Sequence, residues 1–176
     1  MKRSIFSLPV FLLHALLLFL LPMMIESDNL IEKTCKKTPY YDLCVSSLQS
    51  NPQSSNTDVR GLASIMGNIT LSDATNTLNY IQELINQTTD PELERPLTHC
   101  AELYISVVDY ILPQAMEALA NGHYGFAKYG ISDAGEEAHS CEKKTSGLKL
   151  PLTEMNKVMQ NLHDIAVAII NTLLNG

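Results

Sequence analysis

"LTHCAELYISVVDYILPQAMEALANGHYGFAKYGISDAGEEAHSC", residues 97–141, determines the architecture of this chain. Apolar side chains recur in it at alternating steps of three and four, both before and after the pair Asn121-Gly122. That spacing is typical of two amphipathic helices in a bundle, and Asn-Gly favours the turn between them. The first series is Leu97, Ala101, Tyr104, Val108, Ile111, Ala115 and Ala118; the second is Tyr124, Ala127, Ile131, Ala134, Ala138 and Cys141.

One further helix is expected before this stretch and one after it. A third series comprises Met155, Val158, Leu162, Ile165, Ile169 and Leu173. Residues 58–87 show a less regular pattern with a polar middle, which leaves open whether that helix packs loosely or its apolar side rotates. Pro113 lies inside the first series, and since that series stays in phase on both sides, we predict a kink there. Short connections make neighbouring helices antiparallel, so we predict an all-α, up-and-down four-helix bundle over residues 57–176.

The cysteines fit this arrangement. Cys100 lies 22 residues before Gly122 and Cys141 lies 19 after it, so two antiparallel helices bring them to nearly the same height. We expect them to form a disulfide, which leaves Cys35 to pair with Cys44. Nine residues of continuous helix would separate that pair by about 13.5 Å, beyond the reach of a disulfide. The chain is therefore expected to fold back near Pro39, giving a helical hairpin over residues 28–50.

The N-terminus is typical of a secreted protein. Lys2-Arg3 precedes the apolar stretch "FSLPVFLLHALLLFLLPMMI", and we predict a signal peptide over residues 1–27 with cleavage after Ser27. An uncleaved membrane anchor is the alternative, because the stretch is long enough to span a bilayer. Four cysteines in a secreted chain favour two disulfides. Asn68 and Asn86 begin Asn-x-Thr triplets and are candidate glycosylation sites.

The charge balance excludes several classes of partner. Residues 28–176, expected to form a single domain, contain 18 acidic and 10 basic side chains. Such a chain repels nucleic acid and anionic membrane surfaces, so we expect neither as a partner once the signal is cleaved. No motif of a hydrolase, a phosphate-binding loop or a zinc protease occurs, and we expect no catalysis, cofactor or metal. His99 and His139 flank cysteines, but a disulfide is the stronger interpretation in an oxidising compartment.

One segment suggests a binding site. "NGHYGFAKYG", residues 121–130, places aromatic side chains around a helix–helix turn. Tyr124 fits the buried side of its helix, whereas Phe126 points away from it, and an exposed aromatic side chain at a turn is a suitable anchor for a partner. A Phe126 side chain folded back over the bundle end is the alternative. The candidate partner-binding residues are His123, Tyr124, Phe126, Lys128 and Tyr129, joined by the exposed side of 97–120 if a helix face is used.

Three stretches together resemble a known family. They are "NLIEKTCKKTPYYDLCVSSLQSNP" at 29–52, "LTHCAELYISVVDYILPQAMEAL" at 97–119 and "GHYGFAKYGISDAGEEAHSCEKK" at 122–144. Over residues 28–176 the chain resembles the plant invertase and pectin methylesterase inhibitors. The resemblance implies a hairpin outside a four-helix bundle, disulfides 35–44 and 100–141, and no catalytic activity. It also implies a secreted protein of the apoplast, or of the vacuole, that binds a cell-wall carbohydrate-active enzyme one to one and blocks its active-site cleft.

The turn bears on which enzyme is the target. Family members that resemble invertase inhibitors have Pro-Lys-Phe there, whereas this chain has Tyr124-Gly125-Phe126 and lacks the lysine. A tyrosine after the glycine turn is more similar to pectin methylesterase inhibitors. We therefore expect pectin methylesterase as the target, with acid invertase as the alternative and a small-ligand carrier as a remote third function.

Overall fold

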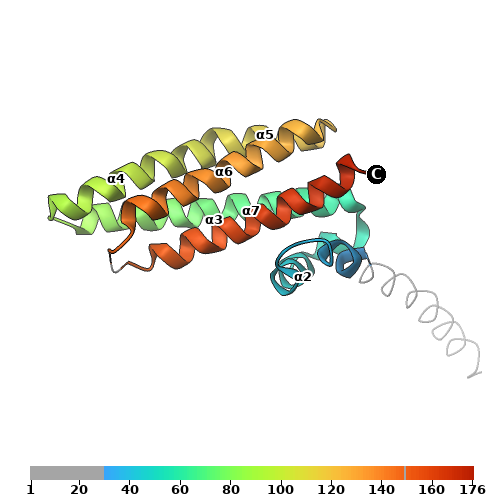
Figure 1. The fold of residues 1–176 in the computed structure, drawn as a ribbon, viewed down its shortest axis with the longest axis horizontal. Helices are drawn as coiled ribbons and strands as arrows, with labels where there is room; N and C mark the ends of the chain where they lie inside the picture. Colours follow the sequence, from blue (N-terminus) through green and yellow to red (C-terminus); the bar gives the residue numbers. More distant parts are fainter. Residues whose placement is uncertain (1–29, 149) are drawn as a thin grey trace, which may run out of the picture.

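The computed structural model describes residues 30–148 and 150–176, and the predicted signal peptide lies outside these ranges. Four helical rods lie side by side and alternate in direction (Figure 1). This confirms the predicted all-α, up-and-down four-helix bundle. The rods are α3 (Val59–Gln87), the continuous run of α4 (Pro91–Ser106), the π-helical segment η2 (Val107–Ile111) and α5 (Leu112–Ala120), then α6 (Tyr124–Thr145) and α7 (Leu152–Leu174).

A helical hairpin precedes the bundle. It consists of a helix over residues 30–35 and α2 (Tyr41–Gln49), followed by the 3₁₀-helix η1 (Pro52–Asn56). The Cys35–Cys44 disulfide joins its two arms with a Cα–Cα distance of 5.6 Å, and the Thr38 hydroxyl donates to the Cys35 carbonyl at the fold-back. Ile31 and Leu48 of the hairpin are buried. The hairpin lies beside the start of α3 and the end of α7, where Thr34, Val59 and Thr172 line one cavity; Figure 1 shows the hairpin outside the four rods.

Side chains and special backbone conformations define the helix boundaries. Asp58 accepts from the Gly61 backbone N–H at 2.8 Å, and Asp90 accepts from the Glu92 N–H at 3.0 Å. These are N-caps, because the carboxylates satisfy free N–H groups of a first helical turn. Gly122 has φ = +76°, a left-handed conformation that favours glycine, and it ends α5.

The buried side of the α4–α5 rod differs from the predicted one. Three predicted core residues are only half-buried: Val108, Ile111 and Ala118. Three others are buried instead: Val107, Leu112 and Leu119. The π-helical turn inserts one residue, so the buried side advances by five positions between Val107 and Leu112 rather than by four. The shift lies at this turn, before Pro113, so the predicted continuity of the apolar series was wrong, while the kink at Pro113 stays a prediction.

Two threonines in the polar middle of α3, Thr70 and Thr77, belong to the core. Thr70 is fully buried, and its hydroxyl donates to the Met66 carbonyl at 2.9 Å. The buried side continues through Ala74 to Leu78 and Ile81. The hydrogen bond satisfies the hydroxyl within its own helix, so a threonine serves here as a core residue.

Candidate functional site

The turn between α5 and α6 fixes the first residues of α6 in space. The His123 backbone N–H donates to the Ala118 carbonyl at 2.8 Å, and the Ala127 N–H donates to the His123 carbonyl at 3.0 Å. These bonds link the end of α5 to the start of α6 through only three residues, 121–123. The candidate residues 123–129 therefore lie on ordered helix rather than on a loose loop.

Phe126 and Tyr129 point into solvent from this first part of α6. Their exposed fractions are 77% and 73%, while Ala127 between them is fully buried. Residues three apart lie on the same side of a helix, so the two rings form one patch. The alternative in which Phe126 folds back over the bundle end is wrong. Exposed aromatic side chains in such an arrangement are typical of interaction sites.

The other predicted contact residues are placed differently. His123 is exposed at the N-cap position of α6. Tyr124 is half-buried and packs against the core, as its place in the apolar series suggests. Lys128 is half-buried and lies about 200° around the helix from Phe126. The structure thus brings Phe126 and Tyr129 together and places Lys128 on another side of α6.

Tyr110 is an exposed aromatic residue that sequence reasoning did not single out. It belongs to η2, and its exposed fraction is 61%. The next residue, Ile111, is close to α6, because a Cβ built at Gly130 would lie 3.5 Å from the Ile111 carbonyl oxygen and 2.8 Å from the Ala115 Cβ. The solvent-facing sides of these two touching helices therefore form one continuous surface.

We call this surface the outer face. Along α6 its members follow one another at steps of three and four, opposite the buried Ala127, Ile131 and Ala134. Along η2 and α5 they lie opposite the buried Leu112, Ala115 and Leu119. The outer face comprises Tyr110, Glu117, Phe126, Tyr129, Asp133 and Glu136.

Carboxylates dominate the charge around these aromatic residues. Residues 96–141 contain six acidic side chains and one lysine, Lys128. Glu137 is the residue after Glu136, the last member of the outer face on α6. Burial raises the pKa of Glu137, the nearby Asp133 raises it further, and His99 lowers it. The aromatic patch thus lies in a stretch of the chain with a net charge of −5.

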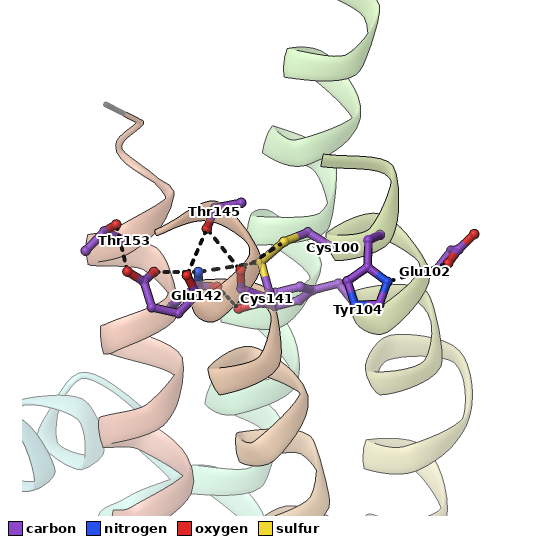
Figure 2. Close-up of a disulfide and its surroundings, with 9 residues drawn as sticks. Cys100, Glu102, Tyr104, Cys141, Glu142, Thr145 and Thr153 are labelled. Carbon is purple, nitrogen blue, oxygen red and sulfur yellow. Dashed lines mark hydrogen bonds and ion pairs between the residues drawn. A yellow bond between two sulfur atoms is a disulfide. The ribbon is translucent and has the colours of Figure 1, made fainter. Parts of the chain in front are cut away.

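The Cys100–Cys141 disulfide ties α4 to α6 (Figure 2). The Cα–Cα distance is 4.8 Å and both residues are fully buried, as expected from their equal heights on antiparallel helices. Within the described residues no cysteine is free and no three His, Cys, Asp or Glu side chains gather as metal ligands would.

A buried polar network extends from this disulfide to α7 (Figure 2). The Tyr104 hydroxyl donates to Asn156 Oδ1 at 2.8 Å, and Asn156 Nδ2 donates to Glu142 Oε2 at 3.0 Å. The Thr153 hydroxyl donates to the other Glu142 oxygen at 3.0 Å. Three rods are thereby held in register at one level.

This network explains a second error in the predicted core. At the start of α7, Met155 is half-buried and Val158 is 39% exposed, whereas Asn156 and Met159 are fully buried. Sequence reasoning missed Asn156, because a polar residue at a core position has no hydrophobic signal. Only its partners on the neighbouring helices show that it can be buried.

Asp73 on α3 is a carboxylate with few compensating contacts. Burial raises its pKa to about 6, and its Oδ2 atom is buried without a hydrogen-bond partner in the part of the chain that the structure describes. It lies close enough to Tyr104 to raise the pKa of that hydroxyl, for which burial is the larger cause. The bundle interior thus disfavours negative charge at this level.

Two other predictions concern the surface of the chain. Asn68 and Asn86 are both exposed on α3, and their glycosylation stays a prediction. None of the helices in residues 30–148 and 150–176 has the length and apolar composition needed to cross a membrane.

Comparison with known proteins assigns this chain to a family. The family model described as plant invertase/pectin methylesterase inhibitor matches residues 29–169. The chain belongs to this family. The family description agrees with the resemblance identified from the hairpin, the α4 stretch and the turn.

Some relatives are named as inhibitors of fructosidase and others as inhibitors of pectinesterase. The chain is 39% identical over 146 residues, 83% of its length and 70% of the relative's, to the cell wall / vacuolar inhibitor of fructosidase 1 of Arabidopsis thaliana. It is 33% identical to the pectinesterase inhibitor of Actinidia deliciosa, over 88% of this chain and 84% of that one. A crystal structure of a mutant form of a pectin methylesterase inhibitor from Arabidopsis superposes with a TM-score of 0.69 at 28% identity, covering 78% of this chain and 92% of the other.

Proposed function

We propose that this protein is a secreted inhibitor that binds a carbohydrate-active enzyme of the plant cell wall and covers its active-site cleft. It has no catalytic activity of its own. The single observation that supports this role best is the outward presentation of Phe126 and Tyr129, which are 77% and 73% exposed, on the first turns of α6. Large aromatic side chains of this kind are the residues that most often dominate the free energy of protein–protein binding.

The bundle is suited to act as a rigid plug. The Cys100–Cys141 disulfide and the Asn156 network fix α4, α6 and α7 relative to one another. A surface that is ordered before binding loses less conformational entropy when a partner covers it. Inhibition is then steric, because the aromatic residues enter the cleft while the helices block access of the polymeric or sugar substrate.

Pectin methylesterase is the target that the geometry favours. The lysine that the resemblance associates with invertase inhibition is absent from the turn, and Lys128 does not replace it, since it is half-buried on another side of α6. Acid invertase is the second candidate, because a relative named as a fructosidase inhibitor is 39% identical to this chain. We expect a one-to-one complex in the apoplast, with the vacuole as the alternative location.

The test compares both enzymes with one set of proteins. Purified inhibitor is titrated at pH 5 against a plant pectin methylesterase and an acid invertase, and the rate of each is followed. We expect stoichiometric inhibition of pectin methylesterase by the wild type. The variant F126A/Y129A should inhibit at least tenfold more weakly, because it lacks two exposed aromatic anchors.

The control for this test is the double variant Y40A/Y41A. It removes two exposed tyrosines from the hairpin, away from the turn, and should inhibit like the wild type. If invertase alone is inhibited, acid invertase is the target and pectin methylesterase is not. A chain that inhibits neither enzyme, or a control that loses as much as F126A/Y129A, would refute the proposal.

A further inference from the structure

We propose that the outer face recognises an enzyme whose active-site rim is cationic, and that its carboxylates select such isoenzymes over acidic ones. This inference rests on the proposed function and deepens it. It concerns which member of a target class is bound, and it arises from the way charge is distributed over the bundle.

The negative charge of the chain is concentrated in residues 96–141, the stretch that contributes every member of the outer face. Residues 96–141 contain six acidic side chains against one lysine. The remaining described residues, 30–95, 142–148 and 150–176, contain eleven acidic and eight basic side chains, among them Arg95 on α4 and Lys143 and Lys144 on α6. The net charge is therefore −5 over residues 96–141 and −3 over all the other described residues together.

The carboxylates and the aromatic anchors share one surface. On α6, Asp133 and Glu136 follow Phe126 and Tyr129 at helical steps of four and three, so all four point to the same side. On α5, Glu117 is exposed two turns after Tyr110. A partner that covers the rings must approach these carboxylates closely.

No ion pair among the described residues involves a carboxylate of this surface. The ion pairs found in the described ranges involve Glu32, Glu92, Glu102 and Asp164, none of which belongs to the outer face. Lys128 projects from another side of α6. Enclosing unpaired carboxylates in an interface costs free energy unless the partner supplies cations, so an acidic rim is repelled and a basic one attracted.

The consequence is a steered association. Complementary potentials raise the rate of encounter at low ionic strength, and salt screens them over a length of about 10 Å at 0.1 M. The aromatic residues contribute most of the affinity, whereas the carboxylates determine which isoenzyme forms the complex quickly and with which orientation.

The experiment uses the full-length secreted protein and two isoenzymes of pectin methylesterase, one with a basic and one with an acidic isoelectric point. Inhibition constants and association rates are measured at 20 and 200 mM NaCl. The test variant E117Q/D133N/E136Q removes three carboxylates of the outer face. The matched control D42N/E83Q/E154Q removes three exposed carboxylates from α2, α3 and α7.

We expect the wild type to inhibit the basic isoenzyme at least tenfold more strongly and to associate with it more slowly at high salt. The test variant should weaken that inhibition roughly tenfold at low salt, while the control variant, with the same net charge, should change it less than threefold. Thermal unfolding of all three proteins shows that each is folded.

The outcomes separate this inference from the function on which it rests. Inhibition that is equal for both isoenzymes, insensitive to salt, or lost equally in test and control variants would overturn the inference and leave the inhibitor function intact. Failure to inhibit either isoenzyme, with acid invertase also unaffected, would overturn both. If acid invertase alone is inhibited, the same variants and salt series applied to basic and acidic invertases decide the question.

Discussion

Replacing Asp73 with asparagine should change stability relative to the wild type in a pH-dependent way. The variant should compare more favourably with the wild type at pH 7 than at pH 4. In the native structure the carboxylate of Asp73 is largely shielded within the bundle, its Oδ2 has no partner among the described residues, and burial raises its pKa to about 6. An aspartate in the unfolded chain keeps a pKa of about 3.9. The folded state therefore binds a proton more readily than the unfolded state does.

The sign and the size follow from this difference. The contribution of Asp73 to stability is fully present below its unfolded-state pKa of about 3.9. It is lost as the pH rises through about 6, because ionisation of this carboxyl favours the unfolded chain. The full difference would correspond to roughly 3 kcal/mol. Asp73 remains partly open to solvent, which reduces the cost to about 1 to 2 kcal/mol between pH 4 and pH 7. For a domain of this size that corresponds to a change of about 3 to 6 °C in Tm.

The assay is urea denaturation of wild type and D73N at pH 4 and pH 7. Because the introduced amide has hydrogen-bonding needs of its own, the diagnostic quantity is how the difference in unfolding free energy changes between the two pH values. D73N should gain about 1 to 2 kcal/mol on the wild type from pH 4 to pH 7. The exposed-site variant D109N is the control and should show no such change. A pH-independent difference between D73N and wild type would refute the reasoning.

Three further predictions concern the network, the helix contacts and the outer face. N156A should lower the free energy of unfolding by about 2 to 4 kcal/mol, because it leaves the buried hydroxyl of Tyr104 without its acceptor; a loss below 0.5 kcal/mol in denaturation would contradict this. G135A should destabilise the protein by about 1 to 2 kcal/mol, because its Cβ would overlap the His163 ring. Adding H163A to G135A should turn that loss into a gain, which a double-mutant cycle would measure. Y110A should weaken target inhibition about three- to tenfold without lowering Tm, whereas unchanged inhibition would remove Tyr110 from the contact surface.

The fold was predictable where simple geometry decides it. The rise of an α-helix fixes the heights of Cys100 and Cys141, and the reach of a disulfide requires the chain to turn back between Cys35 and Cys44. The outward direction of Phe126 likewise follows from its rotation relative to the neighbouring buried positions. These inferences need only helix geometry and the order of the helices along the chain, and no detail of how side chains pack between the rods.

The remaining errors have a common cause in tertiary packing. Val107-Val108 and Ile111-Leu112 are apolar doublets, so the hydrophobic pattern fits an α-helix in one phase and a π-helical turn in another. Which member of each doublet is buried depends on contacts with the other rods. Asn156 is buried because hydroxyl and carboxylate partners meet it from two other helices, and no periodicity records that.

The location of target binding is tested most directly by amide hydrogen exchange of the inhibitor, free and in complex with its enzyme. The account predicts slower exchange in residues 106–117 and 121–137, which include η2, the turn and the first half of α6. The hairpin at 30–49 and the helix α3 should exchange as in the free protein. Protection confined to the hairpin or to α3, with residues 121–137 unchanged, would contradict the claim that the outer face blocks the enzyme.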